Sequence, residues 1–285
     1  MMADFSNALR LIALATALSW STALSCFGGL ASADEAPAVP EVRPGVLKGY
    51  LPKEAVPDSA ALLPSPPAVG SAAEELDQDV ARANLALRGS ERWRLAAMDA
   101  NLSFPEAAGT FSCALGAAVT EQDTPRLYRM LRRIMTDAGF ATFSAKEKYQ
   151  HARPFMLDGQ PTCTPDKEQT LRAQGSYPSG HTSIGWAWAL VLAEASPGES
   201  DAILARGRAF GESRLVCNVH WESDVIEGRF IGAATVARLH AEPDFLADLA
   251  AAKAELAAAR AKALPPQRDC KFEAEALTQT PPQSP

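Results

Sequence analysis

The sequence predicts an all-α fold with one domain, and three observations support this. Residues 71–87 carry Ala, Glu, Leu and Asp without Pro or Gly, and segments of similar helical composition follow them as far as residue 264. Few segments show the apolar–polar alternation of a strand, and no internal repeat is present. Hydrophobic residues make up 47% of the 285 residues and charged residues 21%, which is typical of a globular chain with a sizeable core.

The N-terminus indicates an export signal over residues 1–33. Arg10 precedes an apolar run at residues 11–30, and Ala31-Ser32-Ala33 offers a cleavage site with small residues. The alternative is a membrane anchor, but the Ser, Thr and Gly residues within the run and the cleavage pattern after it favour a signal peptide. We therefore expect a periplasmic or secreted protein with no stable membrane insertion after cleavage.

Cleavage after Ala33 would remove Cys26 and leave an even number of cysteines. An even count in an exported protein favours disulfides, and four cysteines allow three pairings, among which the sequence does not choose. Buried free thiols are the alternative. The spacings match no zinc pattern, so we predict no metal site. The four cysteines are Cys113, Cys163, Cys217 and Cys270.

Proline and glycine divide the rest of the chain. Residues 34–70 are rich in proline and should be extended, either packed over the surface or loose. The helical domain spans 71–264, and within it residues 155–177 indicate a long loop of the kind that is often functional. Residues 265–285 form a polar, Pro-rich tail that we expect to be mobile except at Cys270. Helices are expected over residues 71–87, 91–98, 104–120, 124–138, 140–153, 181–195, 199–214, 223–240 and 245–264.

A first candidate segment holds two cations. Lys146 and Arg153 are seven residues apart, so on one helix both would project from the same face. Two cations on one face repel each other unless an anion lies between them. A solvated basic face is the alternative. Arg153 stands just before Pro154, at the end of the expected helix, where its planar guanidinium could point into a cleft.

A second segment, Pro178-Ser179-Gly180-His181, precedes an apolar helix. Gly180 allows a ligand to approach the backbone, and a helix N-terminus presents unpaired N–H groups to an anion. Ser179 could add a hydroxyl donor, and His181 could protonate a leaving oxygen. The alternative is a helix that Ser179 merely caps, with no ligand.

A third segment adds Arg214 and a His–Asp pair. Because His220 and Asp224 are four residues apart, the carboxylate could accept from one imidazole nitrogen and leave the other free as a nucleophile. A surface contact is the alternative. His151, in the first segment, is given no chemical role.

Together these segments resemble a known family. Lys-x6-Arg-Pro, Pro-Ser-Gly-His and Ser-Arg-x5-His-x3-Asp resemble the signature of the type 2 phosphatidic acid phosphatase superfamily. Residues 61–71, 175–182 and 220–224 resemble the bacterial class A non-specific acid phosphatases, and the likeness runs from about Tyr50 to about His240. Asn218 departs from the glycine expected there. The implied fold is the compact helical bundle of this superfamily and of the vanadium haloperoxidases.

The resemblance implies a broad-specificity acid phosphatase that hydrolyses phosphate monoesters without a metal ion or other cofactor. His220 would attack phosphorus and become phosphohistidine, Asp224 would orient it, and His181 would act as general acid and then as base. Phosphotransferase activity would follow when an alcohol replaces water. Positioned cations and N–H groups can supply the charge that phosphoryl transfer requires. The residues implied to hold the phosphate are Lys146, Arg153, Ser179, Gly180 and Arg214.

Three alternative functions remain at this stage. A vanadate-dependent haloperoxidase would hold vanadate on His220, but such enzymes are usually much longer chains. A membrane lipid phosphatase would need several apolar spans. A non-catalytic oxyanion-binding protein would not need the intact set of His181, His220 and Asp224. The formal net charge of -7 argues against nucleic acid as a partner, and the resemblance allows a homo-oligomer.

Overall fold

Residues 38–281 are described in this computed structural model, and the predicted signal peptide at residues 1–33 lies outside them. The all-α prediction is confirmed, because the only sheet in the described part is a two-stranded hairpin of β1 (Glu41–Arg43) and β2 (Val46–Leu47). The helices are α1 (Ser59–Leu62), α2 (Ala72–Leu85), α3 (Glu91–Asp99), α4 (Ser112–Leu115), α5 (Pro125–Phe140), α6 (Phe143–Tyr149), α7 (Pro154–Asp158), α8 (Glu168–Arg172), α9 (Gly180–Ala195), α10 (Ser200–Val216), α11 (Glu222–Leu239), α12 (Pro243–Ala261) and α13 (Cys270–Leu277).

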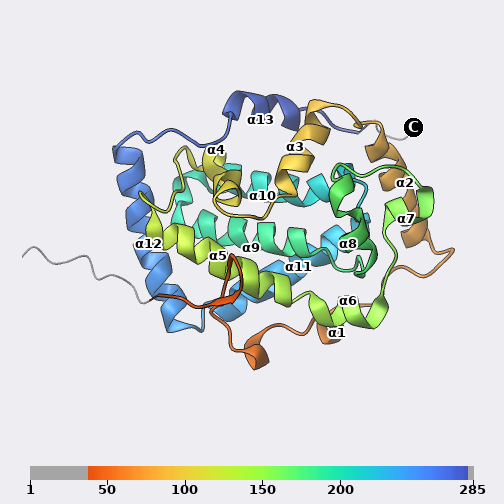
Figure 1. Cartoon of the computed structure of the whole chain (residues 1–285), viewed down its shortest axis with the longest axis horizontal. Coiled ribbons are helices and arrows are strands. Elements are labelled where there is room, and N and C mark those ends of the chain that lie inside the picture. Colours follow the sequence, from red (N-terminus) through yellow and green to blue (C-terminus); the bar gives the residue numbers. More distant parts are fainter. Residues whose placement is uncertain (1–37, 282–285) are drawn as a thin grey trace, which may run out of the picture. The chain divides into compact units, whose positions relative to one another are not determined.

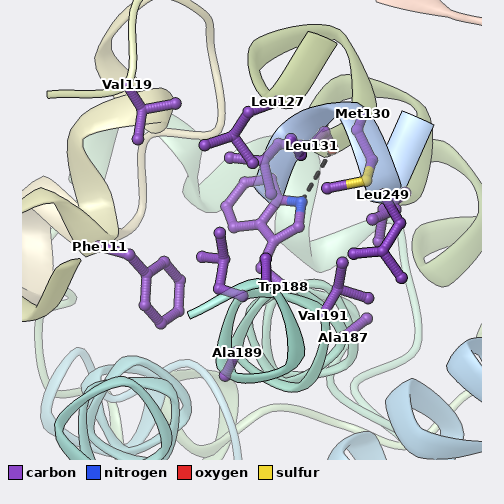
Figure 2. Packing of buried hydrophobic residues seen from close by; sticks show 14 of the residues in the cluster. Phe111, Val119, Leu127, Met130, Leu131, Ala187, Trp188, Ala189, Val191 and Leu249 are labelled. Atoms are coloured by element: carbon purple, nitrogen blue, oxygen red, sulfur yellow. Dashed lines mark hydrogen bonds between the residues drawn. The ribbon is translucent and has the colours of Figure 1, made fainter. Parts of the chain in front are cut away.

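Helix α9 forms the centre of the bundle, with α5, α10 and α11 packed along it (Figure 1). Its sequence is apolar on nearly every side, as expected of a helix that other helices surround. Trp188 lies fully buried in its middle, and the indole Nε1 donates to the Leu131 carbonyl of α5 at 2.8 Å (Figure 2). Burial of a large side chain of this kind contributes roughly 1.5–3 kcal/mol. The core therefore fixes α9 against α5.

Glycines let α11 approach α9 closely. A Cβ at Gly228 would lie 2.7 Å from the Ser179 carbonyl oxygen, and one at Gly232 would lie 2.5 Å from that of Ser183. Both contacts are too short for any side chain. At the same end of the two helices, the Ser179 N–H donates to the Asp224 carbonyl at 2.9 Å. The glycines thus bring the start of α11 beside the start of α9.

Two expected helices are wrong in extent. Residues 140–153 do not form one helix, because α6 ends at Tyr149 and Gln150 takes a left-handed φ of 45°. The proline after Arg153 disfavours helical backbone at that residue, which is extended with ψ of 154°. Residues 104–120 form a 3₁₀ helix (Glu106–Phe111) followed by α4, which ends at Gly116 with φ of 62°.

Disulfides tie two segments that sequence patterns left loose. The expected loop at 155–177 contains the short helices α7 and α8, and Cys163 joins it to Cys217 at the end of α10. The C-terminal segment, expected to be a mobile tail, contains α13, which packs on α3 and is joined to the bundle by Cys113–Cys270. The structure therefore selects one of the three pairings.

The proline-rich segment packs over the surface. Its hairpin and the residues after it lie on α5, where the Asp137 carboxylate accepts from the N–H groups of Tyr50 at 2.8 Å and Leu51 at 3.3 Å. The Thr136 hydroxyl also donates to the Leu47 carbonyl at 2.7 Å. Across residues 38–281, no helix is both long and apolar enough to cross a membrane.

Candidate active site

The N-terminus of α9 presents the donor groups from which an anion seat was predicted. Ser179 is the N-cap, and its Oγ accepts from the Thr182 N–H at 3.3 Å and from the Thr182 hydroxyl at 2.9 Å. Because Oγ accepts both bonds, its own hydrogen remains able to donate to an anion. Gly180 and His181 follow in the first turn, whose N–H groups have no partners within the helix. This end of α9 can bind a tetrahedral oxyanion.

His220 and Asp224 form a buried pair at the start of α11. The Asp224 Oδ2 atom lies 2.9 Å from His220 Nδ1 and accepts from the Trp221 N–H at 3.0 Å. The spacing predicted that both residues share one helical face, but His220 precedes the helix. The contact arises instead because Asp224 lies in the first turn of α11 and caps it. The carboxylate holds the imidazole proton on Nδ1 and leaves Nε2 unprotonated. That nitrogen can act as a nucleophile.

Electrostatics favour a neutral imidazole beside an ionised carboxylate. Burial, together with the nearby Arg153 guanidinium, lowers the pKa of His220 well below 6.5. Burial alone would raise the pKa of Asp224, but the nearby His151 imidazole and the hydrogen bond with His220 hold it below its usual value. His220 is therefore unprotonated and hydrogen-bonded before any substrate arrives.

His151 is a site residue that the sequence reasoning missed. Its Nδ1 lies 3.1 Å from the Ser176 hydroxyl and 3.6 Å from Asp224 Oδ1, and the Ser176 hydroxyl itself donates to that oxygen at 3.3 Å. His151 and Asp224 are 73 positions apart in the sequence, so no local spacing connects them. The only signal was the position of His151 within the same segment as Arg153.

Lys146 and Arg153 meet although they do not share a helix. The Lys146 ammonium donates to the Gly175 carbonyl at 2.8 Å, and the Arg153 guanidinium donates to the same oxygen at 3.3 Å. Arg153 also donates to the Val219 carbonyl at 2.9 Å, and its Nη1 lies 3.1 Å from His220 Nε2. Arg153 is thus in direct contact with the nitrogen that would attack phosphorus.

Arg214 is the third cation and lies in the last turn of α10 with 2% of its surface exposed. In the described part of the chain, its Nη1 has one hydrogen bond, to the Cys217 sulfur at 3.9 Å, and its Nε has no hydrogen-bond partner. Burial lowers the pKa of Lys146 to about 7, of Arg153 to about 10 and of Arg214 to about 9. Within residues 38–281 none of the three forms an ion pair, which is unfavourable unless an anion binds.

His181 lies in the first turn of α9, with Nε2 3.1 Å from the Ala100 carbonyl oxygen. A carbonyl accepts only, so Nε2 carries the proton and Nδ1 can take up or release another. Burial and the charge of Arg214 lower the pKa of His181 well below 6.5. The field of a bound anion would oppose that lowering.

A pocket of about 780 Å³ connects these groups with solvent. Five of the predicted residues line it, while Ser179, Arg214 and Asp224 are buried around it. The five lining residues are Lys146, Arg153, Gly180, His181 and His220.

Asn218 shows how the chain accommodates its departure from the expected glycine. It takes a left-handed φ of 60°, a conformation that asparagine tolerates better than most residues. Its Nδ2 donates to the Asp158 carboxylate at 3.1 Å. The turn before His220 is therefore kept.

Comparison with known proteins gives a consistent family. Residues 131–244 match the model of the PAP2 superfamily. The chain is 43% identical to the non-specific acid phosphatase of Providencia stuartii over 239 residues, which is 82% of this chain and 96% of that protein. It is 44% identical to the non-specific acid phosphatase of Salmonella typhimurium over 208 residues, or 73% and 83%. An acid phosphatase of Zymomonas mobilis is 38% identical over 217 residues, or 76% and 82%.

Proposed function

Because the chain belongs to the bacterial class A non-specific acid phosphatases of the PAP2 superfamily, and so hydrolyses phosphate monoesters, we propose that it does so through a phosphohistidine at His220. One observation carries the proposal. His220 Nδ1 is held by Asp224 at 2.9 Å, and Nε2 lies 3.1 Å from the Arg153 guanidinium. A phosphate that accepts from that guanidinium in place of Nε2 would lie beside the Nε2 lone pair and leave it able to attack.

In the first step, His220 Nε2 forms a bond to phosphorus while the ester P–O bond breaks. The leaving alkoxide takes a proton from His181, and Asp224 stabilises the positive charge on the imidazole. In the second step, water gives a proton to His181 and attacks phosphorus, and the P–N bond breaks to release inorganic phosphate. An alcohol in place of water would give phosphotransfer.

The buried cations would supply the stabilisation of the transition state. Lys146, Arg153 and Arg214 would contact the transferred oxygens, with the Ser179 hydroxyl and the Gly180 N–H at the helix end. Each preorganised donor contributes on the order of 3 kcal/mol to lowering such a barrier. Because these side chains provide the charge, we propose that no metal ion takes part.

Acidic working pH follows from the role of His181, which must be protonated to act as an acid. Burial and Arg214 lower its pKa in the empty pocket, whereas a bound phosphate dianion would raise it. The two disulfides fit an oxidising compartment, so we propose a periplasmic or secreted enzyme.

The test is hydrolysis of p-nitrophenyl phosphate at acid pH with a chelator present. We expect the wild-type protein to turn over under these conditions, and His220→Ala to lose on the order of 10³-fold or more in kcat. Vanadate-dependent bromination is the comparison assay for the haloperoxidase alternative. A His220→Ala variant with wild-type activity would overturn the proposed mechanism.

A further inference from the structure

Two exposed aromatic rings line the same pocket as the buried cations. Phe140 ends α5 and Phe143 begins α6, and their ring centroids are 5.3 Å apart with an interplanar angle of 53°. They are 41% and 47% exposed, respectively, although four of the other seven phenylalanines in residues 38–281 are buried. Both line the pocket, so this exposed apolar surface faces the space that a substrate would enter.

The rings lie close to the anion seat. Phe143 and Lys146 are three residues apart on α6, which places their Cβ atoms about 5–6 Å apart on one face. The Lys146 Cε and the Thr142 hydroxyl lie 4.0 and 3.6 Å from the position that a Cβ on Gly180 would occupy. Phe143 is therefore one helical turn from a cation at the seat, a distance that a ring bonded directly to the ester oxygen can span.

A further apolar residue extends the apolar surface of Phe140 and Phe143 toward His181, the proposed general acid. Ile184 lies three residues after His181 on α9, lines the pocket and is 5% exposed. Its Cδ1 lies 3.6 Å from the position of a Cβ on Gly139, so it contacts the end of α5 that carries Phe140. The leaving group, which must depart toward His181, would thus meet apolar surface.

We infer that Phe140 and Phe143 form a subsite for the leaving group, and that this enzyme favours aryl phosphates, in which an aromatic ring is bonded to the ester oxygen. The inference rests on the proposed function, since it uses His181 and the phosphate seat to orient the substrate. Aromatic rings gain from apolar burial and from edge or offset contacts with other rings. Polyol phosphates would gain neither.

The pocket is also lined by charged side chains, which could favour a different class of substrate from the aryl phosphates. Arg43 lines the rim, and Lys167 does so with its ion-pair partner Asp166 at 3.3 Å. Substrates with a second anionic group would be preferred if these charges outweighed the rings. Fructose 1,6-bisphosphate is a suitable probe for that outcome.

The experiment compares kcat/KM for phenyl phosphate and glycerol 2-phosphate in the wild type and in Phe143→Ala. We expect the ratio of the two values to fall roughly tenfold in the variant, and Phe143→Tyr to restore it. Comparing each substrate with itself across variants cancels the intrinsic reactivity of the leaving groups. Phe230→Ala is the matched control, since Phe230 is 51% exposed on α11 and is not a lining residue of the pocket.

Binding without turnover separates the two proposals. Calorimetry should show phenylphosphonate binding more tightly than methylphosphonate, with the difference reduced in Phe143→Ala. Equal losses for both substrates in Phe143→Ala, or a wild-type preference for the bisphosphate over phenyl phosphate, would overturn the aromatic subsite. If the wild type hydrolysed neither ester but still bound phenylphosphonate more tightly than methylphosphonate, the result would count against the proposed function and not against the aromatic subsite.

Discussion

Replacing Arg214 with methionine should make the empty protein more stable and the enzyme much slower. The guanidinium is 2% exposed, and its one hydrogen bond within the described residues is to a disulfide sulfur. Burial lowers its pKa to about 9, which corresponds to roughly 5 kcal/mol at about 1.36 kcal/mol per pH unit. Replacing buried ionic groups by apolar ones typically recovers about 1–4 kcal/mol, so we expect Arg214→Met to gain about 2 kcal/mol.

The sign of this effect with pH follows from the lowered pKa. The unfolded chain binds the proton more tightly than the folded chain, so the penalty is fully present below about pH 9. Denaturant unfolding at pH 6, without phosphate or sulfate, is therefore the proper assay. In the same protein, kcat/KM for a phosphate monoester should fall about 10²- to 10³-fold.

Arg206 supplies the matched control because it is equally buried but paired. It contacts Asp99 at 2.5 Å and Glu273 at 3.2 Å. Arg206→Met would leave buried carboxylates poorly compensated and should destabilise by about 3–5 kcal/mol. The reasoning is refuted if Arg214→Met is destabilised like Arg206→Met in anion-free buffer, since the guanidinium would then have a partner that the structure does not show.

Three further predictions concern the pocket and its support. His151→Phe removes an imidazole 3.6 Å from Asp224 Oδ1 that helps to keep this carboxylate ionised, so kcat/KM for a phosphate monoester should fall, and His151→Gln, which keeps a donor, should lose less; wild-type activity in His151→Phe would remove His151 from the mechanism. Sulfate keeps its charge between pH 5 and 9, and its affinity should weaken by up to about tenfold per unit above pH 7, because binding requires Lys146 to regain its proton; a flat profile in calorimetry would contradict this. Gly228→Ala places a methyl group 2.7 Å from the carbonyl oxygen of the α9 N-cap residue and should cost about 1–3 kcal/mol together with activity. Gly198→Ala, which meets nothing within 4 Å, should be nearly neutral in both thermal unfolding and turnover, and equal effects of the two would argue against close helix packing as the cause.

Local chemistry explains what the sequence predicted well. The apolar stretch after Ser179 predicted α9 with Ser179 as its cap, because capping and helix ends depend on neighbouring residues, while the anion seat at this end stays a prediction. The His220–Asp224 contact was also predicted, although its geometry is that of a helix cap. Lys146 and Arg153 were predicted to share one helical face, but the helix is broken at Gln150. The two side chains come together because both donate to the Gly175 carbonyl.

Long-range contacts explain what the sequence could not predict. Helix α13 lies in a polar, proline-rich segment and depends on Cys113–Cys270 and on the buried ion pairs of Arg268 with Asp99 and Glu273. His151 likewise approaches Asp224 although no periodic spacing in the sequence links the two residues. Such contacts depend on tertiary packing, which a pattern in a short stretch of sequence does not indicate.

Direct trapping of the phosphoenzyme tests the central claim. Protein mixed with ³²P-labelled monoester at acid pH, quenched within milliseconds in alkali, should carry label that is stable to base and labile to acid, as expected of a P–N bond. Peptide mapping should place that label on His220, and His220→Ala should carry none. Label on another residue, or single-turnover hydrolysis with no labelled protein at any time, would contradict a phosphohistidine at His220.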